Sequence, residues 1–312
     1  MTQISYEAIH PHGVRPNLLV GAALLTGLGL SEVAAPWVGR RHPAKPARID
    51  CPSEQSGILA FGGLTQANGA FAGALEPHIG KVASVSYGST VNTREIGALL
   101  SRYHEQRGMQ SWQAVCSSLG LLTLMRSLQC AVDDNMPIPA LTTIWAVSSP
   151  REPSDVYHHR AYTPLPRLVS RVGGVVFQVG GELVIGDWDP RHPVHSVRRN
   201  VRIVREHLPN MQTPMQWGSH LDMLYKEAEQ LNLSGLADAG VIGDHTTVRF
   251  AGCKGDRVVR GAQAADSWGN DFGAVGATFE RWMTEGAAHA DVSAPPSMFW
   301  LPVNREPLPI AV

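Results

Sequence analysis

The chain has 312 residues, of which 44% are hydrophobic and 17% are charged. This is the composition of an ordinary folded protein, and it argues against a disordered or fibrous chain. The formal net charge is −1 at pH 7, so no overall field attracts nucleic acid, and we expect no nucleic-acid partner.

The beginning of the chain contains one apolar stretch, which covers residues 17–30. This stretch is shorter than the roughly 20 residues that a membrane-spanning helix needs. The small residues 33–35 resemble a signal-peptidase site, but Pro36 follows them directly and is unfavourable there. We therefore expect an N-terminal extension over residues 1–50, with an apolar helix, in a cytoplasmic protein. Contact of residues 15–35 with a membrane surface or a partner protein, and export, stay open as alternatives.

Short apolar segments alternate with helical segments from residue 57 onwards. The expected strands cover residues 57–61, 81–87, 141–147, 246–251 and 277–283, and one more strand ends just before Ser118. Helices are expected over residues 93–106 and from Leu119 to about Asp133. Strands that alternate with helices imply right-handed crossovers and a mostly parallel, doubly wound sheet with helices on both faces. The predicted fold class is therefore α/β.

The alternation stops between residues 151 and 240. This stretch has its own strand-like and helical pieces, including expected helices over residues 196–208 and 217–231. We predict that residues 151–240 form an inserted subdomain, which divides a single core into residues 51–150 and 241–312.

The cysteines lack the spacing of a metal site or a redox pair. There are four of them, none in a C-x-x-C pair or beside a patterned set of histidines: Cys51, Cys116, Cys130 and Cys253. We interpret Cys116 and Cys253, which lie at the ends of expected strands, as buried free thiols. The sequence indicates no metal and no cofactor.

One serine, Ser118, lies where an expected strand turns into an expected helix. The run before it ends in Cys116 and Ser117, and Leu119 and Gly120 open the apolar segment after it. A serine at such a tight turn is held in a strained backbone conformation with its hydroxyl exposed. The helix that starts there offers free N–H groups to a developing oxyanion. The simpler alternative is a serine that only caps the helix.

An aspartate and a histidine lie just past later strands of the expected sheet. Asp256 follows the strand at 246–251 through a glycine-containing turn, and His289 lies in a loop of small residues after the strand at 277–283. Ligands and catalytic groups of parallel α/β sheets gather at this carboxyl edge. A histidine can take the proton of a serine hydroxyl when a carboxylate fixes its tautomer and stabilises its cation. Ser118, Asp256 and His289 are therefore predicted to form a catalytic triad.

In these residues the chain resembles the α/β-hydrolase family, whose triad runs in the order nucleophile, acid, histidine. The resemblance covers roughly residues 57–150 and 240–300. The family's G-x-S-x-G motif is matched at Ser118 and Gly120, while Cys116 replaces the first glycine. The fold that the resemblance implies agrees with the alternation of strands and helices.

The resemblance also implies an oxyanion hole made of two backbone N–H groups. One belongs to the residue after the nucleophile, here Leu119. The other belongs to the loop that follows the strand at 57–61, and we expect Leu64 to provide it. Phe61 stands where the family usually has a histidine before the glycine of that loop.

The activity that the resemblance implies is that of a serine esterase or lipase, with a small-molecule or lipid-like carboxylic ester as substrate. Thioester hydrolysis and acyl transfer on the same triad stay open. Ser117 is a possible alternative nucleophile, but only Ser118 has a glycine two positions on. Three other aspartates stay open as the triad acid in place of Asp256: Asp155, Asp266 and Asp291.

The insertion lies where this family commonly has a cap over the active site. Five arginines from Arg191 to Arg205, with no acid among them, could attract an anionic group, although a solvated helix face is the simpler interpretation. A function from another class is a non-catalytic binding or scaffold protein that uses the N-terminal helix or the Arg191–Arg205 segment as its contact surface. The oligomeric state is left open.

Overall fold

The computed structural model describes residues 46–51, 57–63, 68–88, 90–156, 223–256, 258–285 and 289–301. Several expectations fall outside these residues: the apolar helix within residues 1–50, the helix over 196–208, the Arg191–Arg205 segment and Leu64. Most of the predicted insertion also lies there, so the division of the chain into a core and a cap stays a prediction.

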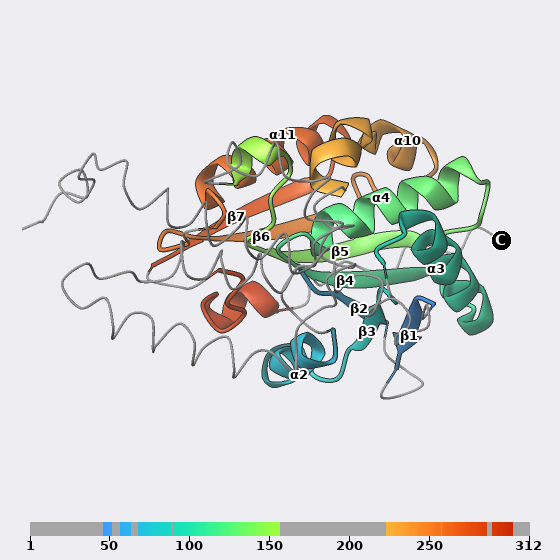
Figure 1. Cartoon of the computed structure of the whole chain (residues 1–312), viewed down its shortest axis with the longest axis horizontal. Helices are drawn as coiled ribbons and strands as arrows, with labels where there is room; N and C mark the ends of the chain where they lie inside the picture. The colour runs from blue at the N-terminus through green and yellow to red at the C-terminus, as the bar shows by residue number, and fades with distance from the viewer. Residues whose placement is uncertain are drawn as a thin grey trace, which may run out of the picture.

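A seven-stranded sheet forms the centre of the described structure (Figure 1). The strands in chain order are β1 Arg48–Asp50, β2 Ile58–Phe61, β3 Ala83–Ser86, β4 Ser111–Ser117, β5 Ala140–Val147, β6 Thr247–Cys253 and β7 Thr278–Thr284. Their order across the sheet is β1-β3-β2-β4-β5-β6-β7. All neighbouring pairs are parallel except β1 and β3. The prediction of a mostly parallel sheet is confirmed.

Helices cover both faces of this sheet, as predicted (Figure 1). One face carries α3 Thr93–Arg107, α4 Gly120–Asp133, α10 Leu233–Asp238 and α11 Gly261–Ala274, and the other carries α2 Asn68–Ile79 and the 3₁₀ helix η6 Ser297–Trp300. Shorter turns are the 3₁₀ helices η2 Pro153–Asp155 and η5 Ala228–Gln230 and the π-helical turn η4 Met223–Glu227. The described part of the helix expected over 217–231 consists of η4 and η5.

The core is divided by the sheet into two apolar clusters, one on each face. In β4, for example, Ala114 and Cys116 face the cluster beneath α3, α4 and α11, whereas Val115 faces the cluster beneath α2 and η6. All three side chains are buried, because a central parallel strand has both faces covered. Cys116 and Cys253 are buried free thiols, as predicted.

The start of the predicted insertion contacts a residue near its end. The Nη1 group of Arg151 donates a hydrogen bond of 2.7 Å to the carbonyl oxygen of Ala228. Residue 151 follows the carboxyl end of β5, which is beside β4 in the sheet. The predicted insertion ends at the opposite edge, because the N–H of Leu141, near the start of β5, donates to Val241 O at 2.8 Å.

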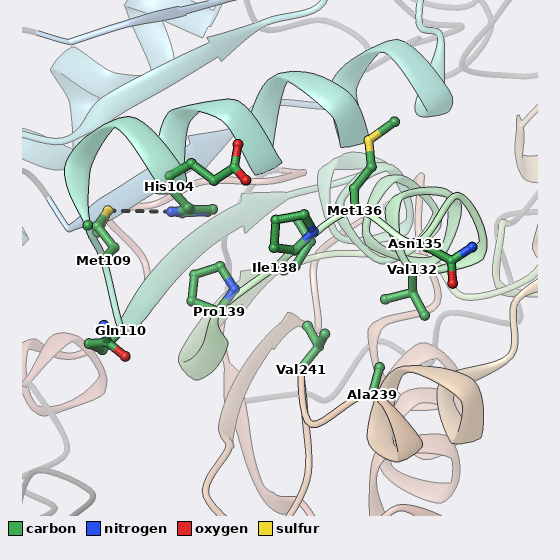
Figure 2. Close-up of a pocket in the computed structure, with 13 residues that line it drawn as sticks. His104, Met109, Gln110, Val132, Asn135, Met136, Ile138, Pro139, Ala239 and Val241 are labelled. Carbon is green, nitrogen blue, oxygen red and sulfur yellow. Dashed lines mark hydrogen bonds between the residues drawn. The ribbon is translucent and has the colours of Figure 1, made fainter. Parts of the chain in front are cut away.

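A histidine is buried at the opposite edge of the sheet, where β4 and β5 begin. His104, in the last turn of α3, packs against the rings of Tyr103 and Trp112, and its side chain lines a cavity of about 620 Å³ (Figure 2). Its Nδ1 lies 3.4 Å from the sulfur of Met109, which can only accept, so Nδ1 carries the proton. Burial lowers the pKa of His104 to about 4.

This histidine predicts a loss of stability in mild acid. Between pH 6.5 and about 4 the unfolded chain binds a proton on residue 104 that the folded chain does not, so the free energy of unfolding falls as the pH falls through this window. The lowered pKa corresponds to about 3 kcal/mol. We expect urea unfolding at pH 7 and pH 4.5 to show a smaller fall for His104→Phe than for the wild type. If the free energy of unfolding fell by the same amount in the wild type and in His104→Phe, His104 would be protonated in the folded protein at pH 4.5, and its pKa would not be lowered.

Candidate active site

Ser118 occupies a strained turn between β4 and α4. Its φ angle is +48°, in the left-handed region that a side chain other than glycine rarely adopts. The backbone N–H of Ser118 donates to Val147 O at 2.9 Å, which continues the ladder between β4 and β5 and holds the turn in place. A helix begins two residues later, at Gly120. The predicted strand, tight turn and helix are all present, with a strained serine at the turn.

Close backbone contacts explain the glycines around this turn. A Cβ atom added to Gly120 would lie 2.1 Å from the carbonyl oxygen of Phe61. One added to Gly63 would lie 2.4 Å from Cβ and 3.1 Å from Oγ of Ser118. The turn after β2 and the turn at Ser118 therefore touch through their backbones, and only glycine leaves enough room.

The structure brings the three predicted triad residues into one hydrogen-bonded chain. Nε2 of His289 lies 2.9 Å from Oγ of Ser118, and Nδ1 of His289 lies 2.9 Å from Oδ2 of Asp256. Asp256 comes from the turn after β6, and His289 from the loop after β7. Ser118 and His289 are 171 residues apart in the sequence, and Asp256 and His289 are 33 residues apart. The three residues meet because each follows the carboxyl end of a parallel strand, and these ends lie at the same edge of the sheet.

Hydrogen-bonding rules assign the protons in this chain. An ionised carboxylate only accepts hydrogen bonds, so Nδ1 of His289 is the donor to Asp256. The other ring nitrogen, Nε2, then has a lone pair in the neutral imidazole and accepts the hydrogen bond of the Ser118 hydroxyl. This is the tautomer that a base for the serine proton requires.

The surroundings of Asp256 keep its carboxyl group ionised. Burial alone raises the pKa of this group, but the neighbouring His289 and the backbone N–H groups of Val259 and Val258 outweigh burial and bring the pKa below its usual value. The two N–H groups donate to Oδ1 at 3.0 and 2.8 Å, while Oδ2 faces the histidine. Each oxygen of the carboxylate thus has its own partners, which fixes the orientation of the group.

The other candidate acids have partners elsewhere. Asp155 is fully buried, and its carboxylate accepts from the backbone N–H groups of Arg151 and Glu152. Asp266 pairs with Arg281, and Asp291 accepts from the backbone N–H and the hydroxyl of Ser293. Of the four aspartates considered, Asp256 is the one whose carboxylate contacts His289.

The backbone that could form an oxyanion hole is partly described. Leu119 directly precedes α4 as its N-cap residue, so its N–H belongs to the group at a helix start that has no partner within the helix. Leu64 lies outside the described residues, but the turn that leads to it, Phe61–Gly63, touches Ser118.

Two side chains that hold this turn were not singled out for that role from the sequence. The hydroxyl of Tyr87 donates to Gly62 O at 2.7 Å, and Oγ of Ser117 accepts from the N–H of Gly63 at 3.2 Å. Ser117 therefore faces the turn, whereas the histidine contacts Ser118. No local pattern marks Tyr87, because its contact joins the ends of β2 and β3 across the sheet.

Two further properties concern the described residues as a whole. Within them, no group of three or more His, Cys, Asp or Glu side chains is arranged to hold a metal ion. None of the helices described is both long enough and apolar enough to span a membrane.

No protein-family model and no curated protein sequence matches the chain. Solved structures do match. The chain is similar to a hydrolase from Pseudomonas aeruginosa PA01, with a TM-score of 0.51 and 13% identity over 81% of this chain and 90% of that chain. It is also similar to MGS-M2, an alpha/beta hydrolase enzyme from a Medee basin deep-sea metagenome library, with a TM-score of 0.50 and 12% identity over 81% of this chain and 90% of that chain. Together with the strand order, these matches show that the chain has the α/β-hydrolase fold.

Proposed function

We propose that this protein is a serine hydrolase that cleaves a carboxylic ester through an acyl-enzyme on Ser118. In this proposal His289 is the general base and Asp256 orients it. The backbone N–H groups of Leu119 and Leu64 stabilise the oxyanion. No cofactor takes part.

The observation that carries the proposal is the unbroken hydrogen-bonded chain from Asp256 through His289 to Ser118, with both contacts at 2.9 Å. A buried serine that only capped a helix would need neither a histidine in hydrogen-bond contact nor a carboxylate behind it. The positive φ of Ser118 adds support, because strained backbone conformations of this kind cluster at active sites, where the surrounding structure holds them in place.

The chemistry follows from the proton positions. Oγ of Ser118 forms a bond to the carbonyl carbon of the ester while Nε2 of His289 takes the hydroxyl proton. The carbonyl π electrons move to oxygen, and the resulting oxyanion lies near the start of α4, where the N–H of Leu119 and the helix dipole favour negative charge. Collapse of this intermediate expels the alcohol, which takes the proton from His289. Water then cleaves the acyl-enzyme by the same steps.

The expected substrate has a sizeable apolar acyl group. The predicted insertion starts at the carboxyl edge of the sheet, where Ser118 also lies, and Ala228 within it contacts Arg151 at this edge. A segment that covers this edge would enclose the acyl group, and enclosed small-molecule sites are mainly apolar. A series of p-nitrophenyl esters of increasing acyl length should therefore show rising kcat/KM beyond the acetate.

Labelling with a fluorophosphonate probe tests the activated serine. We expect the wild-type protein to be labelled, and Ser118→Ala to be unlabelled because the attacking oxygen is missing. A matched control is Ser148→Ala: Ser148 is also buried and also has a positive φ, +49°, but it lies at the end of the neighbouring strand β5. This variant should be labelled like the wild type. A folded wild-type protein that takes up no probe would contradict the proposed function.

A further inference from the structure

We propose that Tyr87 and Ser117 are positioning residues of the oxyanion hole, because they hold the Gly62–Gly63 peptide group by both of its ends beside the nucleophile. This inference rests on the proposed hydrolase function and deepens it. It assigns roles to two side chains whose hydrogen bonds to this peptide lie outside the Ser118–His289–Asp256 chain.

The two hydrogen bonds act on a single peptide group. Tyr87 donates its hydroxyl to Gly62 O at 2.7 Å, and the N–H of Gly63 donates to Oγ of Ser117 at 3.2 Å. The carbonyl of Gly62 and the N–H of Gly63 belong to the same planar unit, so this peptide cannot rotate without breaking both contacts. Tyr87 is 1% exposed and Ser117 is fully buried, so water does not compete for either bond.

The turn needs such anchors because of its own composition. Two consecutive glycines are the most flexible backbone that a sequence can offer. Gly63 has to be glycine, however, because a Cβ at this position would overlap Cβ of Ser118. The loop that carries the second oxyanion donor starts from this pair. The close contact with Ser118 thus requires a glycine, which makes the turn flexible. Hydrogen bonds with Tyr87 and Ser117, which lie outside the turn, restrict this flexibility.

Tyr87 also keeps its hydroxyl proton, which the hydrogen bond to Gly62 O requires. Burial, followed by the nearby Cys116, raises the pKa of the Tyr87 phenol well above its usual value, and the side chain of Thr123 lowers it by less. Tyr87 is therefore a neutral donor at any working pH.

Removal of the Tyr87 hydroxyl should harm the transition state more than substrate binding. With p-nitrophenyl butyrate, we expect Tyr87→Phe to lower kcat about 10- to 100-fold and to leave KM within about twofold, because a displaced donor matters only once the oxyanion forms. Ser117→Ala should act in the same direction. The double variant should lose less than the product of the two single losses, because both changes release the same peptide.

A trifluoromethyl ketone inhibitor distinguishes this role from a general effect on folding. The ketone adds to Oγ of Ser118: the O–C bond forms, the carbonyl electrons become an oxyanion, and His289 takes the proton. Its affinity therefore depends on the oxyanion hole, and it should fall in Tyr87→Phe by the same factor as kcat. The extent of fluorophosphonate labelling after long incubation reports the fraction of folded protein and should stay complete.

Matched controls remove hydroxyl groups elsewhere in the core. Tyr103→Phe removes a tyrosine hydroxyl on α3 whose contact is the sulfur of Cys51 at 3.7 Å. Ser127→Ala removes a buried hydroxyl on α4 that has no hydrogen-bond partner among the described residues. Both variants should keep kcat and ketone affinity within about twofold of wild type, since neither hydroxyl contacts the turn.

The outcomes separate this inference from the proposed function. A wild-type protein with turnover and labelling, together with a Tyr87→Phe variant as active as Tyr103→Phe, would overturn the positioning role and leave the hydrolase intact. Should Tyr87→Phe fail to fold, Ser117→Ala tests the same peptide from its other end, and an unchanged kcat there would also overturn the role. A wild-type protein with neither turnover nor labelling would overturn both.

Discussion

Replacing His289 by alanine is expected to lower kcat for p-nitrophenyl butyrate about 10⁴- to 10⁶-fold, because Ser118 then has no base to take its proton. The contact that the change removes is the 2.9 Å hydrogen bond between Nε2 and the serine hydroxyl. His289→Ala should also prevent labelling by the fluorophosphonate probe on the timescale at which the wild type is labelled completely. Initial rates under saturating ester, with circular dichroism to confirm folding, measure the effect.

The same experiment identifies the triad acid. Asp256→Asn should lower kcat about 10³- to 10⁴-fold, because an amide no longer fixes the tautomer of His289 or stabilises its cation. Asp155→Asn is the matched control, since Asp155 is equally inaccessible but accepts its hydrogen bonds from Arg151 and Glu152. We expect this control to lower stability and to retain kcat. A loss of kcat as large for Asp155→Asn as for Asp256→Asn would mean that the acid is assigned wrongly.

Gly120→Ala is expected to lower the free energy of unfolding by about 3 kcal/mol, the upper part of the range for overpacked cores. The added Cβ would lie 2.1 Å from O and 2.8 Å from C of Phe61, which are backbone atoms that no change of rotamer can move away. The turn at Phe61–Gly63 must then shift away from Ser118, so kcat should fall together with stability. Urea unfolding at pH 7 measures the first effect, and ester hydrolysis measures the second.

A second glycine provides the control with the opposite sign. Gly73 lies within α2, and a Cβ added there meets no atom of the described residues within 4 Å. Gly73→Ala should therefore raise stability by roughly 0.5–1 kcal/mol, because alanine has less backbone freedom to lose on folding. Equal behaviour of the two glycine variants would show that the close approach at Gly120 can relax without a penalty.

Local patterns were enough to predict most of the sheet. The strands at 57–61 and 141–147 are mostly apolar, because central parallel strands are buried on both faces. The strand at 246–251 also carries Arg249, whose side chain pairs with Glu280 on β7. β1 was missed because only three residues, Arg48–Asp50, form it, and charged residues stand at both of its ends. Such a short strand forms because it pairs with β3, and no pattern in its own residues predicts this pairing.

The turn at Ser118 was also predicted from the sequence, because an apolar strand, small residues and an apolar helix follow one another there without a gap. The choice among the aspartates was not. Asp155 and Asp256 both follow a strand at the same edge of the sheet, and the two differ only in how the chain bends after the strand. In the folded protein Asp155 is turned towards backbone N–H groups of its own segment, and Asp256 is turned towards His289.

The sequence by itself therefore determined the α/β class, the position of the strained serine and the order of the three candidate catalytic residues, because each depends on neighbouring residues or on strand periodicity. Only the tertiary structure decided which carboxylate meets the histidine, that Tyr87 and Ser117 hold the Gly62–Gly63 peptide, and that His104 is buried without its charge. These properties depend on hydrogen bonds and burial between segments that are distant in the chain, and distances of about 3 Å between such segments are set by the packing of the whole core.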